Sequence, residues 1–182
     1  MRIMHIGKLH FKPINESFDL VAYPIKESIQ GTNLAASLYV AKINPDLADT
    51  ASFCKEYEVD LMIATNCLII EATRADRTWY AACLILATDM ADINGIIRKR
   101  LNARKTSFAP IDTALKFTHM EYGGITPLGL PKDWLILIDV AVMKHDVVVI
   151  GGGIRGSKIA INTTAFSLLP HSTILKITKT VK

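Results

Sequence analysis

The sequence has few of the residues that build disulfides or metal sites. Its 182 residues include three cysteines, Cys54, Cys67 and Cys83, which form no C-x-x-C pair and have no histidine at a ligand spacing. An odd number of scattered cysteines favours buried thiols over disulfides or zinc. The five histidines are equally dispersed, at positions 5, 10, 119, 145 and 171. We therefore expect neither a metal nor a cofactor.

Long apolar runs are also missing, although half of the residues are hydrophobic and the mean hydropathy is +0.27. The longest apolar-rich run, 134–143, contains Asp139 and is far shorter than the ~20 residues that a membrane-spanning helix needs. Residues 1–12 carry charges and lack the apolar region of a secretory signal. These absences predict a cytoplasmic protein with no membrane partner.

The sequence contains none of the common catalytic spacings: no G-x-S-x-G elbow, no H-E-x-x-H and no phosphate-binding P-loop. Gly151-Gly152-Gly153-Ile154-Arg155-Gly156 follows a strand-like run but does not fit a dinucleotide fingerprint. A strand rather than a long helix is expected after it, and too little chain remains for a βαβ unit. A nucleotide-cofactor enzyme is therefore not expected.

Neither sign of charge dominates, since the net charge is +4 and the pI is about 9.0. The cations are nevertheless clustered, because Arg98, Lys99, Arg100, Arg104 and Lys105 fall within eight residues. Such a run is either a solvated helix face or a surface that meets phosphates.

The apolar pattern predicts short helices and strands without a repeat. Amphipathic helices are expected at 46–58, at 90–101 after a Thr88-Asp89 cap, and at 107–118, with a helical turn at 165–169. Strands are expected at 38–43, 67–71, 79–88, 134–142, 147–150, 158–161 and 173–178, with 72–78 as a hairpin loop. The result is an α/β protein of the α+β type, a mixed sheet with helices around it. Residues 1–32, with a short helix over 18–29, are interpreted as an N-terminal extension, and 33–182 as a single domain.

The most distinctive segment is Glu121–Pro131, which combines three glycines and two prolines with apolar Ile125, Leu128 and Leu130. Glycine reaches backbone angles that other residues avoid, while proline fixes φ and removes a donor. This composition predicts a shaped loop whose N–H groups are free for a ligand. With the glycines at 151–156, two turns can flank one pocket.

Gly123-Gly124-Ile125-Thr126-Pro127-Leu128-Gly129 resembles the GG-[IV]-[ST]-P-x-G loop of the YbaK and prolyl-tRNA-synthetase-associated domains. Gly152-Gly153-Ile154-Arg155-Gly156 is similar to the GG-x-R-G turn of that family and follows at about the expected distance. Residues 104–110 occupy the place of the family's basic segment. The resemblance covers roughly 45–175.

This resemblance implies a mixed β-sheet curved into a partial barrel with surrounding helices. It also implies hydrolysis, in trans, of the ester that joins a wrong amino acid to tRNA, with aminoacyl-tRNA as the partner and an aminoacyl-tRNA synthetase as a second one. Backbone donors in the loop would hold the aminoacyl group. The implied catalytic residues are Asn66, Gly123, Gly124, Ile125, Thr126 and Pro127. Those for substrate binding are Asp139, Gly152, Gly153, Arg155 and Lys105, and those for tRNA phosphates are Arg98, Arg100 and Arg104.

Two positions depart from the family pattern, because Asn66 stands where a lysine is common and Lys158 where some members have an acid. Either the deacylase site is rebuilt around Asn66, or another cation such as Lys105 substitutes, or the chain is a non-catalytic module that binds tRNA ends or a small ligand. Asp139 is either a pocket-lining acid or a buried group bonded to a neighbouring turn. Arg155 either anchors its turn or meets a phosphate.

Overall fold

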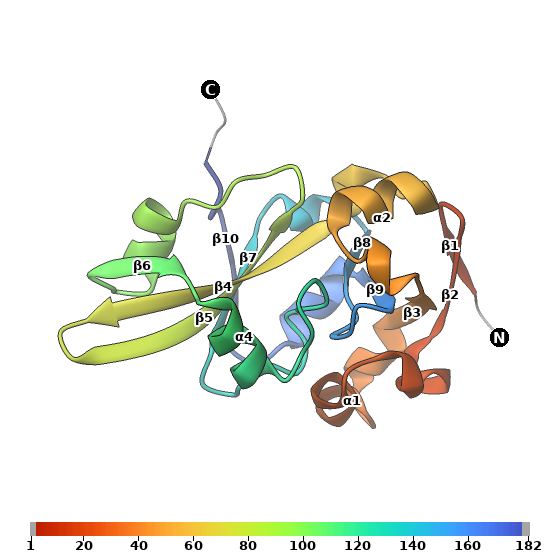
Figure 1. Cartoon of the computed structure of the whole chain (residues 1–182), viewed down its shortest axis with the longest axis horizontal. Coiled ribbons are helices and arrows are strands. Elements are labelled where there is room, and N and C mark those ends of the chain that lie inside the picture. Colours follow the sequence, from red (N-terminus) through yellow and green to blue (C-terminus); the bar gives the residue numbers. More distant parts are fainter. Residues whose placement is uncertain (1–2, 180–182) are drawn as a thin grey trace.

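The computed structural model describes residues 3–179, which form two five-stranded sheets (Figure 1). The first sheet has the order β1-β2-β3-β9-β8 and the second β10-β7-β5-β4-β6. The strands are β1 (Met4–Ile6), β2 (Leu9–Pro13), β3 (Leu38–Lys42), β4 (Thr65–Arg74), β5 (Arg77–Leu86), β6 (Lys105–Phe108), β7 (Leu135–Asp139), β8 (Val147–Gly151), β9 (Ser157–Asn162) and β10 (Ser172–Leu175).

The helices are short. They are α1 (Tyr23–Ile29), α2 (Thr50–Tyr57), α3 (Arg98–Arg100) and α4 (Ile111–Thr118), with a π-helical turn Ile93–Ile97 leading into α3. The 3-10 turns are Ile14–Glu16, Phe18–Leu20, Asn33–Ser37, Pro45–Leu47, Leu61–Ile63, Val142–Lys144 and Thr163–Leu168. Asp49 explains where α2 begins, because its side chain accepts a hydrogen bond from Ser52 N at 3.0 Å.

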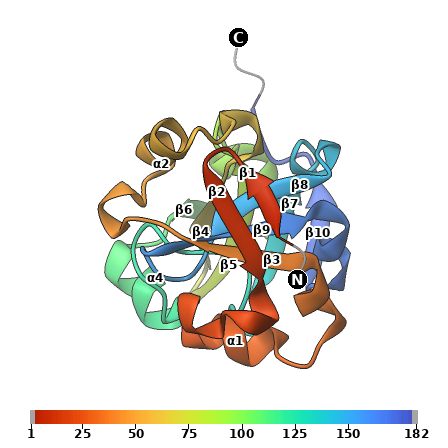
Figure 2. The same ribbon diagram turned by 90° about the vertical axis from the view of Figure 1, so that its right-hand side faces the viewer.

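The sheet is mixed, as expected. All pairs of the first sheet are antiparallel, whereas β7 runs parallel to both β5 and β10. The two sheets meet where Ala64 bridges Val149 and Thr65 Oγ1 donates to Val149 O at 2.8 Å. They form a curled half-barrel with helices around it (Figure 2), which confirms the predicted fold.

Successive side chains of β8 and β9 point to opposite faces of the first sheet, so they pack into two separate parts of the core. Ile150 and Ile159 point into the largest apolar cluster, while Val149 and Ala160 face a second cluster that includes Phe53 of α2. Burial on both faces suits the unbroken apolar run 147–150.

Residues 3–32, within the segment interpreted as an N-terminal extension, contribute to both sheet and core. β2 pairs with β3 through Pro13 and Tyr39, and the side chains of Phe11, Ile14 and Ile25 are fully buried. This part of the chain therefore packs against the remainder.

Three local predictions were wrong. The expected loop 72–78 is a two-residue turn, because β4 and β5 continue as a polar, partly exposed hairpin that pairs with β6. The helix after β5 begins at Asp92 rather than at Thr88-Asp89, since the Asp92 carboxylate accepts from the N–H groups of Gly95 and Ile96. Residues 105–108 are a strand and not the start of a helix.

Candidate active site

The glycine–proline loop (residues 121–131) and the glycine turn (residues 151–156) are locked together. Gly153 N donates to Gly124 O at 2.7 Å, and Glu121 N donates to Gly153 O at 2.8 Å. Arg155 adds two bonds, from its N–H to Glu121 Oε2 at 2.6 Å and from Nη1 to Tyr122 O at 3.1 Å. The two segments thus form one unit, and Arg155 anchors it.

Glycine is required at the centre of this unit. A Cβ on Gly124 would lie 2.7 Å from Ile154 O, a backbone atom that cannot move away cheaply. Gly123 has φ +85°, in the region that side chains disfavour. Within residues 3–179, the N–H groups of Gly123 and Ile125 donate to no other protein group, which leaves them available to a ligand.

Asn66 lies on β4 and is held by the first residue of α2. Its Oδ1 accepts a hydrogen bond from Thr50 Oγ1 at 2.8 Å. The amide nitrogen of Asn66 has no acceptor among the residues that the structure describes, so two donors remain for a ligand or water.

Lys158 on β9 is a buried lysine that the sequence interpretation had noted only as a departure from the family. It is 7% exposed, and its Nζ donates to Ala48 O at 2.8 Å and lies 5.0 Å from the centre of the Phe53 ring. No carboxylate of the described residues forms an ion pair with it. Burial lowers the pKa of Lys158 to about 8.

Ala48 connects these groups to the loop. A Cβ built on Gly123 would lie 3.4 Å from Ala48 Cβ and 3.3 Å from Arg155 Nη1. The Ala48–Thr50 turn therefore borders the glycine–proline loop on one side, while it bonds Lys158 through Ala48 and Asn66 through Thr50. We define the candidate active site as the two locked segments, this turn, Asn66 and Lys158.

A pocket of about 140 Å³ opens beside the loop, between Tyr122 and Ile125 on one side and Cys67 to Ile69 of β4 on another. Its lining has no formally charged side chain and consists of Cys67, Leu68, Ile69, Phe108, Ala109, Ile111, Ala114, Leu115, Tyr122 and Ile125. Burial raises the pKa of the Cys67 thiol to about 12, so this group is neutral near pH 7. The pocket suits an uncharged group.

A larger cavity of about 700 Å³ lies on another side of the loop, between Pro127–Trp134 and α1. Neither space is lined by Asn66, Arg155 or Lys158. We assign the smaller pocket to the candidate site, because its lining includes Ile125, whose N–H has no protein acceptor within residues 3–179, and Cys67, which follows Asn66 on β4.

Residues 44–167 match the family model described as the aminoacyl-tRNA editing domain, which is more than half of the chain. The chain belongs to the aminoacyl-tRNA editing domain family. Among curated proteins, a comparison finds no significant match.

Solved structures share the fold of this editing domain. One, named as a "putative trans-editing enzyme for prolyl tRNA synthetase", has 11% identity and a TM-score of 0.73, covering 86% of this chain and 96% of its own. The hypothetical protein APE2540 has 14% identity and a TM-score of 0.74, with 86% and 99% covered. A scaffold protein from a study of computational epitope grafting has 11% identity and a TM-score of 0.74, with 87% and 97% covered. Family and fold together support a role in tRNA editing.

Asp139 of the editing domain is 1% exposed, and both of its oxygens are used within the fold. Oδ1 accepts from Ala141 N at 2.8 Å, and Oδ2 accepts from Ile177 N at 2.7 Å and Thr178 N at 3.0 Å. Of the two alternatives, the structure shows the buried group bonded to a neighbouring segment.

The structure does not bring Lys105 to the locked loops. Lys105 pairs with Thr73, seven residues beyond Asn66 on β4, or about 23 Å along the strand. Arg104 is held beside it, since its N–H donates to Thr73 O. Both side chains are exposed near the tip of the β4–β5 hairpin, which projects from one end of the editing domain (Figure 1).

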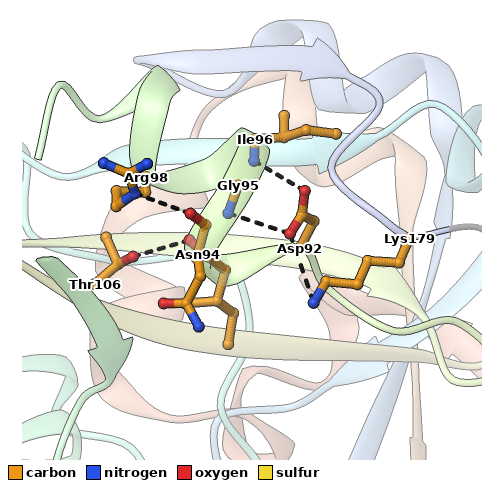
Figure 3. Close-up of polar contacts among 8 residues, drawn as sticks. Asp92, Asn94, Gly95, Ile96, Arg98, Thr106 and Lys179 are labelled. Atoms are coloured by element: carbon orange, nitrogen blue, oxygen red, sulfur yellow. Dashed lines mark hydrogen bonds and ion pairs between the residues drawn. The ribbon is translucent and has the colours of Figure 1, made fainter.

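Arg98 and Arg100 lie on α3, which precedes β6 in the chain. Arg98 Nε donates to Asn94 O at 2.9 Å, beside the Asp92 cap and its 3.7 Å ion pair with Lys179 (Figure 3). Arg100 Nη2 donates to Thr173 Oγ1 at 3.2 Å. These cations therefore form a group separate from the candidate active site.

Within residues 3–179, the editing domain has no group of three or more side chains able to hold a metal ion. The same residues include no helix with the length and apolar character to cross a bilayer. The three cysteines are free thiols, two buried and one half-buried.

Proposed function

We propose that the chain is a cytoplasmic aminoacyl-tRNA deacylase that hydrolyses the ester of mischarged tRNA in trans and so corrects the product of a synthetase. The observation that carries this proposal is the locked loop pair. It presents two N–H groups without a protein acceptor among the described residues, at Gly123 and Ile125, beside an uncharged pocket, and the Ala48–Thr50 turn links it to Asn66.

The ester needs little from the protein, because its carbonyl is already activated. Water attacks the carbonyl carbon, the ester bond breaks, and the ribose oxygen leaves with a proton, giving the free amino acid and uncharged tRNA. Preorganised N–H donors stabilise the oxyanion that forms on the carbonyl oxygen. The amide of Asn66 can orient the attacking water or the ribose. The Cys67 thiol is a poor nucleophile, since burial keeps it protonated.

The cations on α3 and β6 supply the other half of the proposal. The exposed Arg104 and Lys105, which pair beside the β4–β5 hairpin, would contact tRNA phosphates together with Arg98 and Arg100 on α3, while the aminoacyl end enters the pocket. Their separation from the loop suits a ligand much longer than an amino acid.

The test is hydrolysis of a panel of correctly and incorrectly charged tRNAs. We expect the wild-type protein to release one mischarged amino acid rapidly. Gly124→Ala, whose methyl group would meet the Ile154 carbonyl at 2.7 Å, should lose 100-fold or more of this rate, the order of magnitude of one lost oxyanion donor.

Gly156→Ala is the matched control in the glycine turn, because its Cβ would meet only Pro45, at 3.7 Å. This variant should keep the wild-type rate. Equal rates for folded Gly124→Ala and Gly156→Ala would remove the loop from the mechanism.

A second candidate function is a non-catalytic module that binds tRNA ends or a small ligand. The uncharged Asn66 favours it, because this position then offers hydrogen bonds without a cation. Binding of aminoacyl-tRNA in a filter assay, with no turnover of any ester in the panel, would replace the deacylase with this module.

A further inference from the structure

We propose that Lys158 is a positioning residue of the editing site, whose charged ammonium group holds the Ala48–Thr50 turn and thereby fixes Asn66. This inference rests on the proposed function for its catalytic consequence. Its structural part concerns only contacts within the chain.

Packing alone does not explain a lysine at this position. Lys158 shares its face of the first sheet with Val149 and Ala160, which pack against Phe53 of α2. An ammonium group has three donors, and here one neutral acceptor, Ala48 O, and one aromatic ring are its partners among the described residues. Burying a charge with so little compensation costs free energy that an apolar side chain would not.

The contacts lead from Lys158 to the reacting region in two directions. Along the chain, Ala48 is followed by Asp49, the N-cap of α2, and by Thr50, whose hydroxyl donates to Asn66. Across the site, Ala48 Cβ borders the position of Gly123. Loss of the bond from Lys158 would therefore disturb both Asn66 and the wall of the loop.

The charge of Lys158 changes in an accessible pH range. Burial is the main cause of its pKa of about 8, and Arg155 lowers it further, whereas Cys54 and Asp49 raise it. Burial in turn raises the pKa of the Cys54 thiol, while the charge on Lys158 lowers it. Above pH 8 the lysine loses its charge and one of its donors.

The structural test follows the side-chain amide of Asn66 by NMR between pH 6 and 10. In the wild-type protein we expect its resonances to move with a midpoint near pH 8. The movement should be absent in Lys158→Met and move to higher pH in Lys158→Arg. Lys42→Met, which removes an exposed lysine of β3, is the control and should titrate as the wild type. Resonances that do not move, or that move equally in Lys158→Met, would overturn the inference.

The kinetic test compares the same variants on the mischarged tRNA that the wild type hydrolyses. We expect Lys158→Met to lower kcat tenfold or more at pH 7 with little change in KM, and Lys158→Arg to restore part of it. The difference in kcat between the wild type and Lys158→Met should vanish above pH 9. An unchanged pH profile in Lys158→Met would overturn the inference, whereas absence of turnover in the wild type with the expected NMR titration would end the deacylase proposal alone.

Discussion

The buried ammonium of Lys158 predicts an unusual dependence of stability on pH. An unfolded lysine has a pKa of 10.5, whereas the pKa in the fold is about 8. Between these values the unfolded chain binds more protons than the folded one, so the free energy of unfolding rises with pH. The difference of 2.5 between the two pKa values corresponds to about 3 kcal/mol.

The buried thiols have the opposite effect on the pH dependence of stability, so their contribution must be removed by comparison with a variant. Burial raises the pKa of Cys67 to about 12 and raises that of Cys83, so both thiols keep their protons in the fold at a pH where they lose them on unfolding. Their contribution makes the protein less stable as pH rises above 9. Lys158→Met contains the same cysteines, so the contributions of Cys67 and Cys83 cancel in the difference between the two proteins.

The assay is urea unfolding followed by the fluorescence of Trp79 and Trp134, in steps from pH 7 to pH 10.5. At pH 7 the wild type carries the full cost of burying the charge, and this cost disappears as the lysine deprotonates. We expect the unfolding free energy of the wild type, minus that of Lys158→Met, to increase by about 3 kcal/mol over this range. A difference that stays constant would refute the burial argument.

Two further predictions concern groups outside the candidate site. Asp139→Ala should destabilise the protein by about 3 kcal/mol in urea unfolding, because three backbone N–H groups lose their acceptor. The deacylation rate per folded molecule should not change. A loss of this rate without a loss of stability would indicate that Asp139 contacts the substrate. Arg104→Ala should weaken tRNA binding and reduce the slope of log affinity against log salt by about 1, whereas Lys12→Ala on β2 should not. Equal slopes in the two variants would exclude a phosphate contact at Arg104.

The sequence predicts the helices and strands whose hydrophobic pattern is compatible with only one kind of secondary structure. The run 147–150 is apolar without alternation and becomes the buried strand β8. The spacing over 46–58 becomes α2, which begins four residues later than expected because the Asp49 side chain caps it there. The hairpin loop was misplaced since polar residues at 72–78 are compatible with a solvated hairpin as well as with a loop.

Site residues could be predicted where the backbone conformation requires glycine. They could not be predicted where the register of strand pairing determines which side chains lie near the loop. The glycines at 123, 124 and 153 indicate the locked loops, because residues with a Cβ rarely adopt the positive φ of Gly123 and Gly153 or fit the close backbone contacts of Gly124. Lys105 was expected near the loop, but pairing of β6 with β4 places it beside Thr73, and no local pattern gives that register. The signal for Lys158 was present as a lone cation before the continuous apolar run of β9, yet its partner Ala48 is 110 residues away.

The loops of the candidate site are held by backbone contacts, whereas the groups beside them are side chains, so these side chains can differ while the loops are kept. The two glycine-rich segments are held by backbone bonds through Gly124 and Gly153, with Arg155 as an anchor, so they constrain few side chains. Backbone bonds can persist while side chains change, and the fold is shared with a solved structure at 11% identity and a TM-score of 0.73. The chemistry beside the loop depends instead on side chains that the surrounding strands can exchange. The same turn donates a hydrogen bond to Asn66 on β4 and accepts one from Lys158 on β9, so the uncharged Asn66 is connected to a cation through three consecutive residues.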